Sequence, residues 1–125
     1  MIRQVKKPWG HEEIWAENDA YVGKILFIKK GHRLSLQHHV VKLETIRVTQ
    51  GIMCLELEDE NGMINKIELS PGDVCDILPG RKHRMSAITD CEVFEVSTPH
   101  LNDVVRHSDD YGRETITSNE SSNIS

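Results

Sequence analysis

Most of the chain consists of short runs in which hydrophobic and polar residues alternate. The run Ile52–Glu58 (IMCLELE) ends in alternating leucine and glutamate, which predicts a strand with one buried face and one wet face. Tyr21–Lys30 is rich in residues that favour strands. Strands are also predicted over Ser35–Val41, Leu43–Thr49, Ile64–Leu69, Val74–Leu78, His83–Ile88 and Cys91–Ser97. Glycine or proline separates the runs at intervals of roughly ten residues, a spacing typical of a β-sandwich or barrel.

The two ends of the chain depart from this alternation. The turn signal Pro8-Trp9-Gly10 predicts an arm whose tryptophans cover the open end of a sheet, or alternatively place Trp9 at the mouth of a pocket. After Pro99 the segment HLNDVVRH predicts one short helix. Residues 114–125 are polar and contain no aromatic residue, which is typical of a disordered tail. We therefore expect one domain over residues 1–113, followed by that tail.

Size, charge and cysteine content narrow the class of protein. A chain of 125 residues suits one compact domain, and the net charge of −5 disfavours nucleic acid and anionic membranes as partners. The sequence has no apolar run of membrane-spanning length and no opening signal peptide, so we expect a cytoplasmic protein. Cys54, Cys75 and Cys91 lie far apart in apolar runs, without a CxxC pair. They are predicted to be buried, reduced thiols rather than a disulfide framework or a thiolate zinc site.

Side chains that can bind a metal gather in the stretch SLQHHVVKLETIRVTQG, residues 35–51. Because side chains alternate along a strand, Gln37, His39 and Val41 are expected to share one face, and His38 the other. A lone histidine on such a face is more often a hydrogen-bonded core residue than a ligand, and Gln37 could instead bind a substrate. The neighbouring candidates decide in favour of a metal.

Glu44 and His83 complete the candidate site. Glu44 lies among inward-facing positions that are otherwise apolar, where burial of a charge is costly unless the charge is paired or bound to a metal; the alternative is an exposed glutamate at a sheet edge. His83 follows a glycine-rich turn, where strand ends commonly carry function. An amide oxygen, two imidazoles and a carboxylate suit one divalent ion of zinc, manganese, iron, cobalt or nickel. The predicted ligands are Gln37, His39, Glu44 and His83.

The same stretches resemble the two motifs of the cupins. The first motif is matched by glycine, histidine, glutamate and glycine, and the second by two glycines and a histidine; in order, these are Gly31, His39, Glu44, Gly51, Gly72, Gly80 and His83. Four further segments resemble the cupin domain of type II mannose-6-phosphate isomerases: PWG at 8–10, LSLQ at 34–37, GRKHR at 80–84 and VVRHSDDYGR at 104–113. The resemblance implies an all-β fold, the double-stranded β-helix or jelly roll.

The chain departs from that family in three respects. Val41 stands where the second histidine of the first motif is usual, and the Gln37-x-His39 pair is expected to compensate, as a similar pair does in the type I isomerases. Leu78 replaces the proline of the second motif, with Pro79 one position later. The family's cupin domain usually follows a nucleotidyltransferase domain, for which 125 residues leave no room.

The resemblance implies a metal-dependent aldose–ketose isomerase that interconverts mannose 6-phosphate and fructose 6-phosphate. Such a reaction moves a proton between C1 and C2, and the candidates for that transfer are Glu95 and Lys82. The alternative for Glu95 is a strand position that faces solvent. Arginine suits phosphate oxygens, and the candidates for that role are Arg33, Arg84 and Arg106.

Two other functions remain open at this stage. One is a non-catalytic module that binds a sugar or sugar nucleotide, which the absent nucleotidyltransferase domain and Val41 favour. The other is a different metal-dependent cupin enzyme, such as a dioxygenase or lyase, since one fold hosts many chemistries. A homodimer is expected by analogy, with the arm before Tyr21 adding a strand to the partner.

Overall fold

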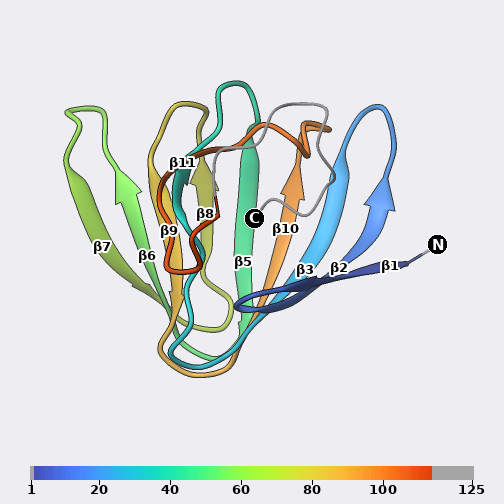
Figure 1. Ribbon diagram of the computed structural model, residues 1–125, viewed down its shortest axis with the longest axis horizontal. Coiled ribbons are helices and arrows are strands. Elements are labelled where there is room, and N and C mark those ends of the chain that lie inside the picture. Colours follow the sequence, from blue (N-terminus) through green and yellow to red (C-terminus); the bar gives the residue numbers. More distant parts are fainter. Residues whose placement is uncertain (1, 114–125) are drawn as a thin grey trace.

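The computed structural model describes residues 2–113, and these residues form strands, turns and no helix. Figure 1 shows the strands curving around a common interior. In chain order they are β1 Arg3–Lys7, β2 Gly10–Glu17, β3 Val22–Ile28, β4 Leu36–His38, β5 Glu44–Gln50, β6 Met53–Glu58, β7 Ile64–Leu69, β8 Val74–Ile77, β9 His83–Ala87, β10 Cys91–Ser97 and β11 Val105–Ser108. The prediction of an all-β jelly roll is confirmed.

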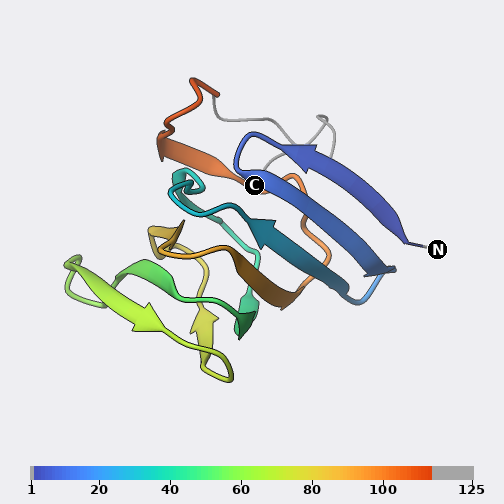
Figure 2. The ribbon, with the colours of Figure 1, turned by 90° about the horizontal axis from the view of Figure 1, so that it is seen from below.

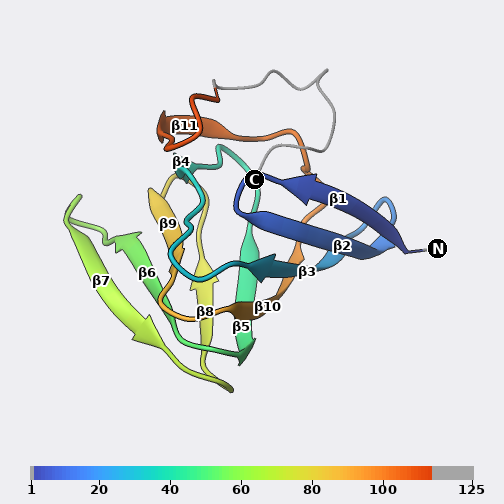
Figure 3. The same ribbon diagram turned by 60° about the horizontal axis from the view of Figure 1, so that its bottom comes forward.

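The strands form two antiparallel sheets. One has the order β1-β2-β3-β10-β5-β8 and the other the order β11-β4-β9-β6-β7, so neighbours in space are often distant in sequence. The β1–β2 hairpin extends the first sheet on one side of the molecule, and the β6–β7 hairpin lies on the opposite side (Figure 3). The view from below in Figure 2 shows how the two sheets enclose the interior between them.

Inward-facing side chains change from polar to apolar along the strands. On the inner face of β5 lie Glu44, then Ile46 and Val48, and on that of β9 lie His83, then Met85 and Ala87, all of them buried. The antiparallel β10 has the reverse order, from Cys91 and Val93 to Glu95 and Ser97. One end of the interior is therefore a hydrophobic core that stabilises the fold, and the other end is a buried polar region.

The N-terminal arm is a hairpin within its own sheet. β1 pairs with β2, and β2 pairs with β3, while Trp9 in the turn between β1 and β2 is fully buried in the hydrophobic core. Gly10 allows the start of β2 to approach the end of β3 closely, because a Cβ atom at position 10 would lie 1.9 Å from the carbonyl oxygen of Phe27. The arm thus contributes to this chain's own sheet, and β1 is the strand at its edge.

The predicted helix after Pro99 is wrong. Residues Val105–Ser108 form β11, which pairs with β4 at the edge of the second sheet. The β-branched residues Val104 and Val105 favour a strand. The edge of β4 also supplies hydrogen-bond partners for the backbone groups of this segment, and a short helix could not form those bonds. The predicted tail, residues 114–125, lies outside the described residues.

Two smaller expectations concern the cysteines and membranes. All three cysteines are free thiols; Cys91 is buried, whereas Cys54 and Cys75 are half-buried. Within residues 2–113 no helix is long and apolar enough to cross a membrane.

Candidate metal centre

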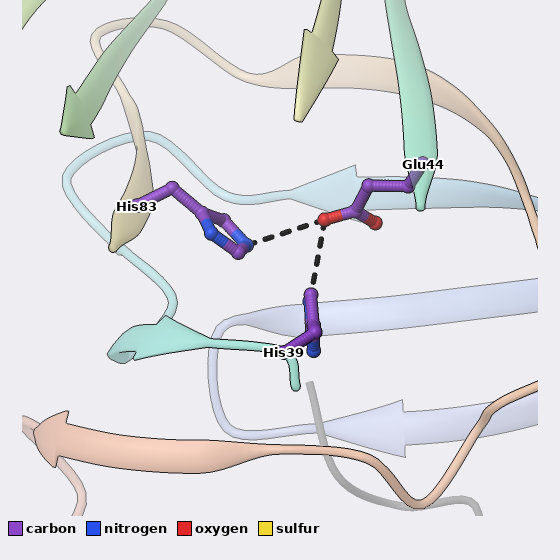
Figure 4. Close-up of side chains that lie close together, drawn as sticks. All are labelled: His39, Glu44 and His83. Carbon is purple, nitrogen blue, oxygen red and sulfur yellow. Dashed lines mark ion pairs between the residues drawn. The ribbon is translucent and has the colours of Figure 1, made fainter. Parts of the chain in front are cut away.

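Three of the predicted ligands meet at the polar end of the interior. His39 follows β4, Glu44 opens β5 and His83 opens β9. Their potential ligand atoms all lie within 4.8 Å of one another (Figure 4). Glu44 Oε1 is 3.3 Å from His39 Nε2 and 3.2 Å from His83 Nε2, and all three side chains are almost completely buried. The Gly80 N–H donates to the carbonyl of His39, which ties the turn before β9 to the residue after β4.

The hydrogen bonds of the two imidazoles leave an electron-rich centre. His39 Nδ1 donates to the carbonyl of Asp103, and His83 Nδ1 donates to that of Arg81. A neutral ring protonated at Nδ1 presents a lone pair at Nε2. Both Nε2 atoms and Glu44 Oε1 are buried without a hydrogen-bond partner, so three acceptors face one another. A divalent cation satisfies all three, whereas two charged imidazoles would add buried positive charge beside Lys42.

Glu44 itself is held in the charged form that a metal requires. Burial favours the neutral acid, but the ammonium group of Lys42, 3.5 Å from Oε2, opposes it, and the pKa of Glu44 lies well below its usual range. One carboxylate oxygen therefore faces the two histidines and the other faces Lys42.

Gln37, the fourth predicted ligand, lies on the same inner face. It is buried and directly opposite His83 in the β4–β9 pairing, and paired residues project from the same side of a sheet. Its Oε1 accepts a hydrogen bond of 2.8 Å from Ser35 Oγ. The structure thus places the amide beside the centre, where it is available either to a metal or to a bound substrate.

Val41 does not share this face, contrary to the prediction. β4 ends at His38 and the chain turns, so Val41 is 54% exposed and points away from the interior. A histidine at position 41 would therefore point outside the interior as well. His38 lies on the face opposite His39, as expected, and its Nδ1 is 2.7 Å from His107 Nε2.

A line of alternating charges leads away from the centre across the inner face of the larger sheet. We call it the charge row; its members are Glu44, Lys42, Glu95, Lys24, Glu12 and Lys7. The distances between their charged atoms, in that order, are 3.5, 3.3, 3.7, 3.4 and 3.7 Å. No side chain in the row is more than 3% exposed. When Lys7 is protonated, three cations and three anions therefore balance one another inside the protein.

Environment shifts the pKa values along the charge row. Burial and the nearby Glu44 raise the pKa of Glu95. Burial lowers the pKa of Lys42, but Glu44 and Glu95 outweigh it and the net shift is upward. At the far end burial prevails, and it lowers the pKa of Lys7 to about 7 despite the ion pair with Glu12.

The sequence singled out only two members of the charge row. Glu95 stood out because it interrupts the apolar positions of CEVFEVS. The same signal marks Lys24, which shares its face with Leu26 and Ile28 in β3, and it was overlooked. Lys7 and Glu12 flank the turn of the arm, and no local pattern showed that they enter the interior.

The three arginines predicted to bind phosphate and the catalytic candidate Lys82 occupy different environments. Arg106 lies opposite Gln37 in the β11–β4 pairing and so faces the metal centre, and burial lowers its pKa. Arg33 is half-exposed and forms a two-pronged ion pair with Asp110. Arg84 is buried and donates to the carbonyls of Leu34 and Ser108. Lys82 is half-buried, and its backbone is bonded to Glu58. Arg106 is thus the one of the four that the strand pairing directs toward the candidate ligands.

Known structures share this architecture. KdgF from Halomonas sp. is 22% identical, with a TM-score of 0.68 over 79% of this chain and 87% of that chain. The oxalate decarboxylase of Bacillus subtilis, which has Mn(II) centres, is 15% identical, with a TM-score of 0.68 over 78% of this chain and 27% of that one. CapF is 17% identical, with a TM-score of 0.70 over 86% and 34%. No protein of curated function matches the sequence.

Two antiparallel sheets around an interior with a His–Glu–His cluster at one end define a cupin. The sequence matches the family described as mannose-6-phosphate isomerase C-terminal over residues 1–99. The chain belongs to that family. The resemblance found in the sequence is therefore confirmed.

Proposed function

We propose that the protein is a metal-dependent aldose–ketose isomerase of a sugar phosphate, acting on mannose 6-phosphate and fructose 6-phosphate. The observation that carries this proposal is the set of three buried acceptor atoms on His39, Glu44 and His83. They fit one divalent ion, with Gln37 as a fourth ligand. Such an ion, when bound, stabilises the negative charge that develops on the oxygens at C1 and C2.

Glu95 is suited to move the proton between C1 and C2. Its raised pKa brings the carboxyl group closer to the range in which it can both accept and return a proton. Lys42 donates to Glu95 at 3.3 Å and also pairs with Glu44, so the proton-transfer group is fixed relative to the ligands. Lys82 is the second candidate for this proton transfer.

The charge balance of the interior favours an anionic substrate. The charge row is neutral by itself, and a divalent ion would add two positive charges to it. Arg106 faces the same region and adds another. A sugar phosphate is an anion, and arginine suits its phosphate oxygens, so Arg106 is the first candidate for phosphate binding, with Arg33 and Arg84 after it.

The decisive test is a coupled assay that follows conversion of mannose 6-phosphate to fructose 6-phosphate. The protein is stripped of metal and then loaded with zinc, manganese, iron, cobalt or nickel in turn. We expect activity only after loading, and we expect Glu95→Gln to lose it while binding the metal as tightly as wild type. Glu68→Gln on the exposed side of β7 is the matched control. No turnover of wild type with any of these metals would reject the isomerase.

A second candidate is a metal-binding module that does not catalyse a reaction. The burial of the ligands favours it, because His39 and His83 are each only 1% exposed and a substrate must be admitted before it can reach the centre. Stoichiometric metal binding without turnover of the sugar phosphate would identify this function.

We also propose that the protein is cytoplasmic and forms a homodimer. The edge strand β1 supports the second proposal, since an edge leaves backbone groups that can pair with another chain. Light scattering of the purified protein tests it, and a monomer at micromolar concentration would refute it.

A further inference from the structure

We propose that Asp103 is the positioning residue of the metal centre: it fixes the turn that carries His39 and Lys42 and sets the orientation of the His39 ring. This inference rests on the proposed metal site, but not on any particular reaction. Neither the sequence motifs nor the chemistry of the ligands points to Asp103, which lies outside every sheet, just before β11.

The carboxylate of Asp103 accepts three consecutive backbone N–H groups. The Val40 N–H donates to Oδ1 at 2.9 Å, and the N–H groups of Val41 and Lys42 donate to Oδ2 at 2.8 and 2.9 Å. These amides belong to the connection between β4 and β5 and lie outside the strands themselves. Charged acceptors form stronger hydrogen bonds than neutral ones, so this one side chain determines the course of the turn.

The backbone carbonyl of the same residue holds the ligand itself. His39 Nδ1 donates to the Asp103 carbonyl, which leaves Nε2 as the atom that faces Glu44. A partner of this kind fixes the tautomer and the ring orientation of a metal-binding histidine. Asp103 therefore holds both the main chain that follows His39 and the ring of His39.

The shape of the turn decides which side chains enter the interior. Val40 and Val41 are 62% and 54% exposed, whereas His39 and Lys42 are 1% and 2% exposed. If the three amides lost their common acceptor, the turn would be free to relax, and His39 and Lys42 would move together. The positions of the candidate ligand His39 and of Lys42 thus both depend on the contact of this turn with the Asp103 carboxylate.

A second anchor should allow the fold to survive the loss of this contact. At the end of the turn, the Leu43 N–H donates to Thr98 Oγ1 at 3.1 Å, and the Thr98 N–H donates to the Leu43 carbonyl at 3.0 Å. The start of β5 therefore remains attached to the end of β10 in an Asp103 variant. This separation of anchors makes Asp103→Asn informative, since it keeps the size and the backbone carbonyl but removes the charge and one acceptor oxygen.

The experiment compares Asp103→Asn with wild type and with Asp59→Asn. Asp59 is the matched control because its carboxylate accepts the N–H groups of Asn61 and Met63, at 2.9 and 3.0 Å, in the β6–β7 turn, which contains no candidate ligand. Zn²⁺ affinity is measured by competition with a chromophoric chelator. We expect Asp103→Asn to weaken it by about 10–100-fold, the usual effect of losing a partner of a metal ligand, and Asp59→Asn to leave it unchanged.

Nuclear magnetic resonance of the metal-free protein gives a readout independent of metal and activity. We expect faster hydrogen exchange at the amides of Val40, Val41 and Lys42 in Asp103→Asn, and a mixture of His39 tautomers in place of Nδ1–H alone. Unchanged exchange and an unchanged tautomer would overturn the inference, as would wild-type Zn²⁺ affinity in the variant. If the variant shows weaker Zn²⁺ binding, faster exchange and mixed tautomers but wild type shows no isomerase activity, the proposed reaction is rejected and the role of Asp103 is retained.

Discussion

Replacement of Glu44 by glutamine should affect metal binding and the metal-free fold in different ways. Glu44 Oε1 faces His39 Nε2 at 3.3 Å and His83 Nε2 at 3.2 Å, and none of these atoms has a hydrogen-bond partner within the protein. A buried polar atom without a partner costs about 1–3 kcal/mol. A glutamine NH₂ group at the same position can donate to both rings, so the variant removes this conflict.

The variant also weakens the contact between Lys42 and the other carboxylate oxygen of Glu44, but the cost to stability is limited. Lys42 gives up the carboxylate oxygen at 3.5 Å but keeps Glu95 at 3.3 Å, so it does not become an unpaired buried charge. We therefore expect the free energy of unfolding of the metal-free variant to lie within about 2 kcal/mol of wild type, with the sign set by these opposing terms. Metal affinity should fall by more than about 100-fold, because the loss of an outer partner alone has an effect of up to that size.

Two measurements check this prediction. Denaturant unfolding of metal-stripped protein gives the stability, and chelator competition gives the metal affinity, with Glu68→Gln on β7 as the control. Wild-type metal affinity in Glu44→Gln would exclude the carboxylate from the centre. A metal-free variant destabilised by more than about 4 kcal/mol would show that Glu44 serves the fold, since losses of that size indicate a broken buried network.

Three further predictions follow from other parts of the structure. Lys7 has a folded pKa of about 7 against an ordinary value of 10.5, so between these pH values only the unfolded chain holds the proton. The free energy of unfolding should therefore rise with pH over this range. In unfolding measured from pH 6 to 10, Lys7→Met should lack this rise. Thiol titration of the native protein should find Cys54 and Cys75 reactive and Cys91 protected, with all three reacting after denaturation, and a fast-reacting Cys91 would contradict its burial. Gly10→Ala should lower the free energy of unfolding by more than about 2 kcal/mol, because its Cβ would lie 1.9 Å from the Phe27 carbonyl oxygen; an unchanged thermal midpoint would refute the close approach.

The fold was predictable because alternation is a local signal. β7 and β10 have the predicted bounds, and each other predicted strand differs from its observed one by a few residues at the ends. The helix expected after Pro99 failed because the edge of β4 provides a partner that is distant in sequence. The hairpin of the arm was missed for a similar reason, since the burial of Trp9 depends on a close approach to β3.

The candidate site was predictable in part. His39, Glu44 and His83 are near the ends of strands whose faces the alternation gives, and the structure brings them together. Val41 was placed on the wrong face because the alternation was extended beyond the end of β4. Asp103 carried no local signal, because its significance lies in three amides more than sixty positions away in sequence.

The charge row has a consequence for how this sequence can change over time. Neutralising one member changes the net charge of the row by one unit, whereas replacing an adjacent pair of opposite sign leaves that net charge unchanged, so we expect substitutions to occur in such pairs. The β1–β2 hairpin contributes one cation and one anion, Lys7 and Glu12, and its loss would leave four charges that still balance. Charges at the hairpin end of the row can therefore be lost as a cation–anion pair without changing the net charge of the rest. At the other end the row closes on a metal ligand, and there a change in one residue alters the charge that the ion encounters.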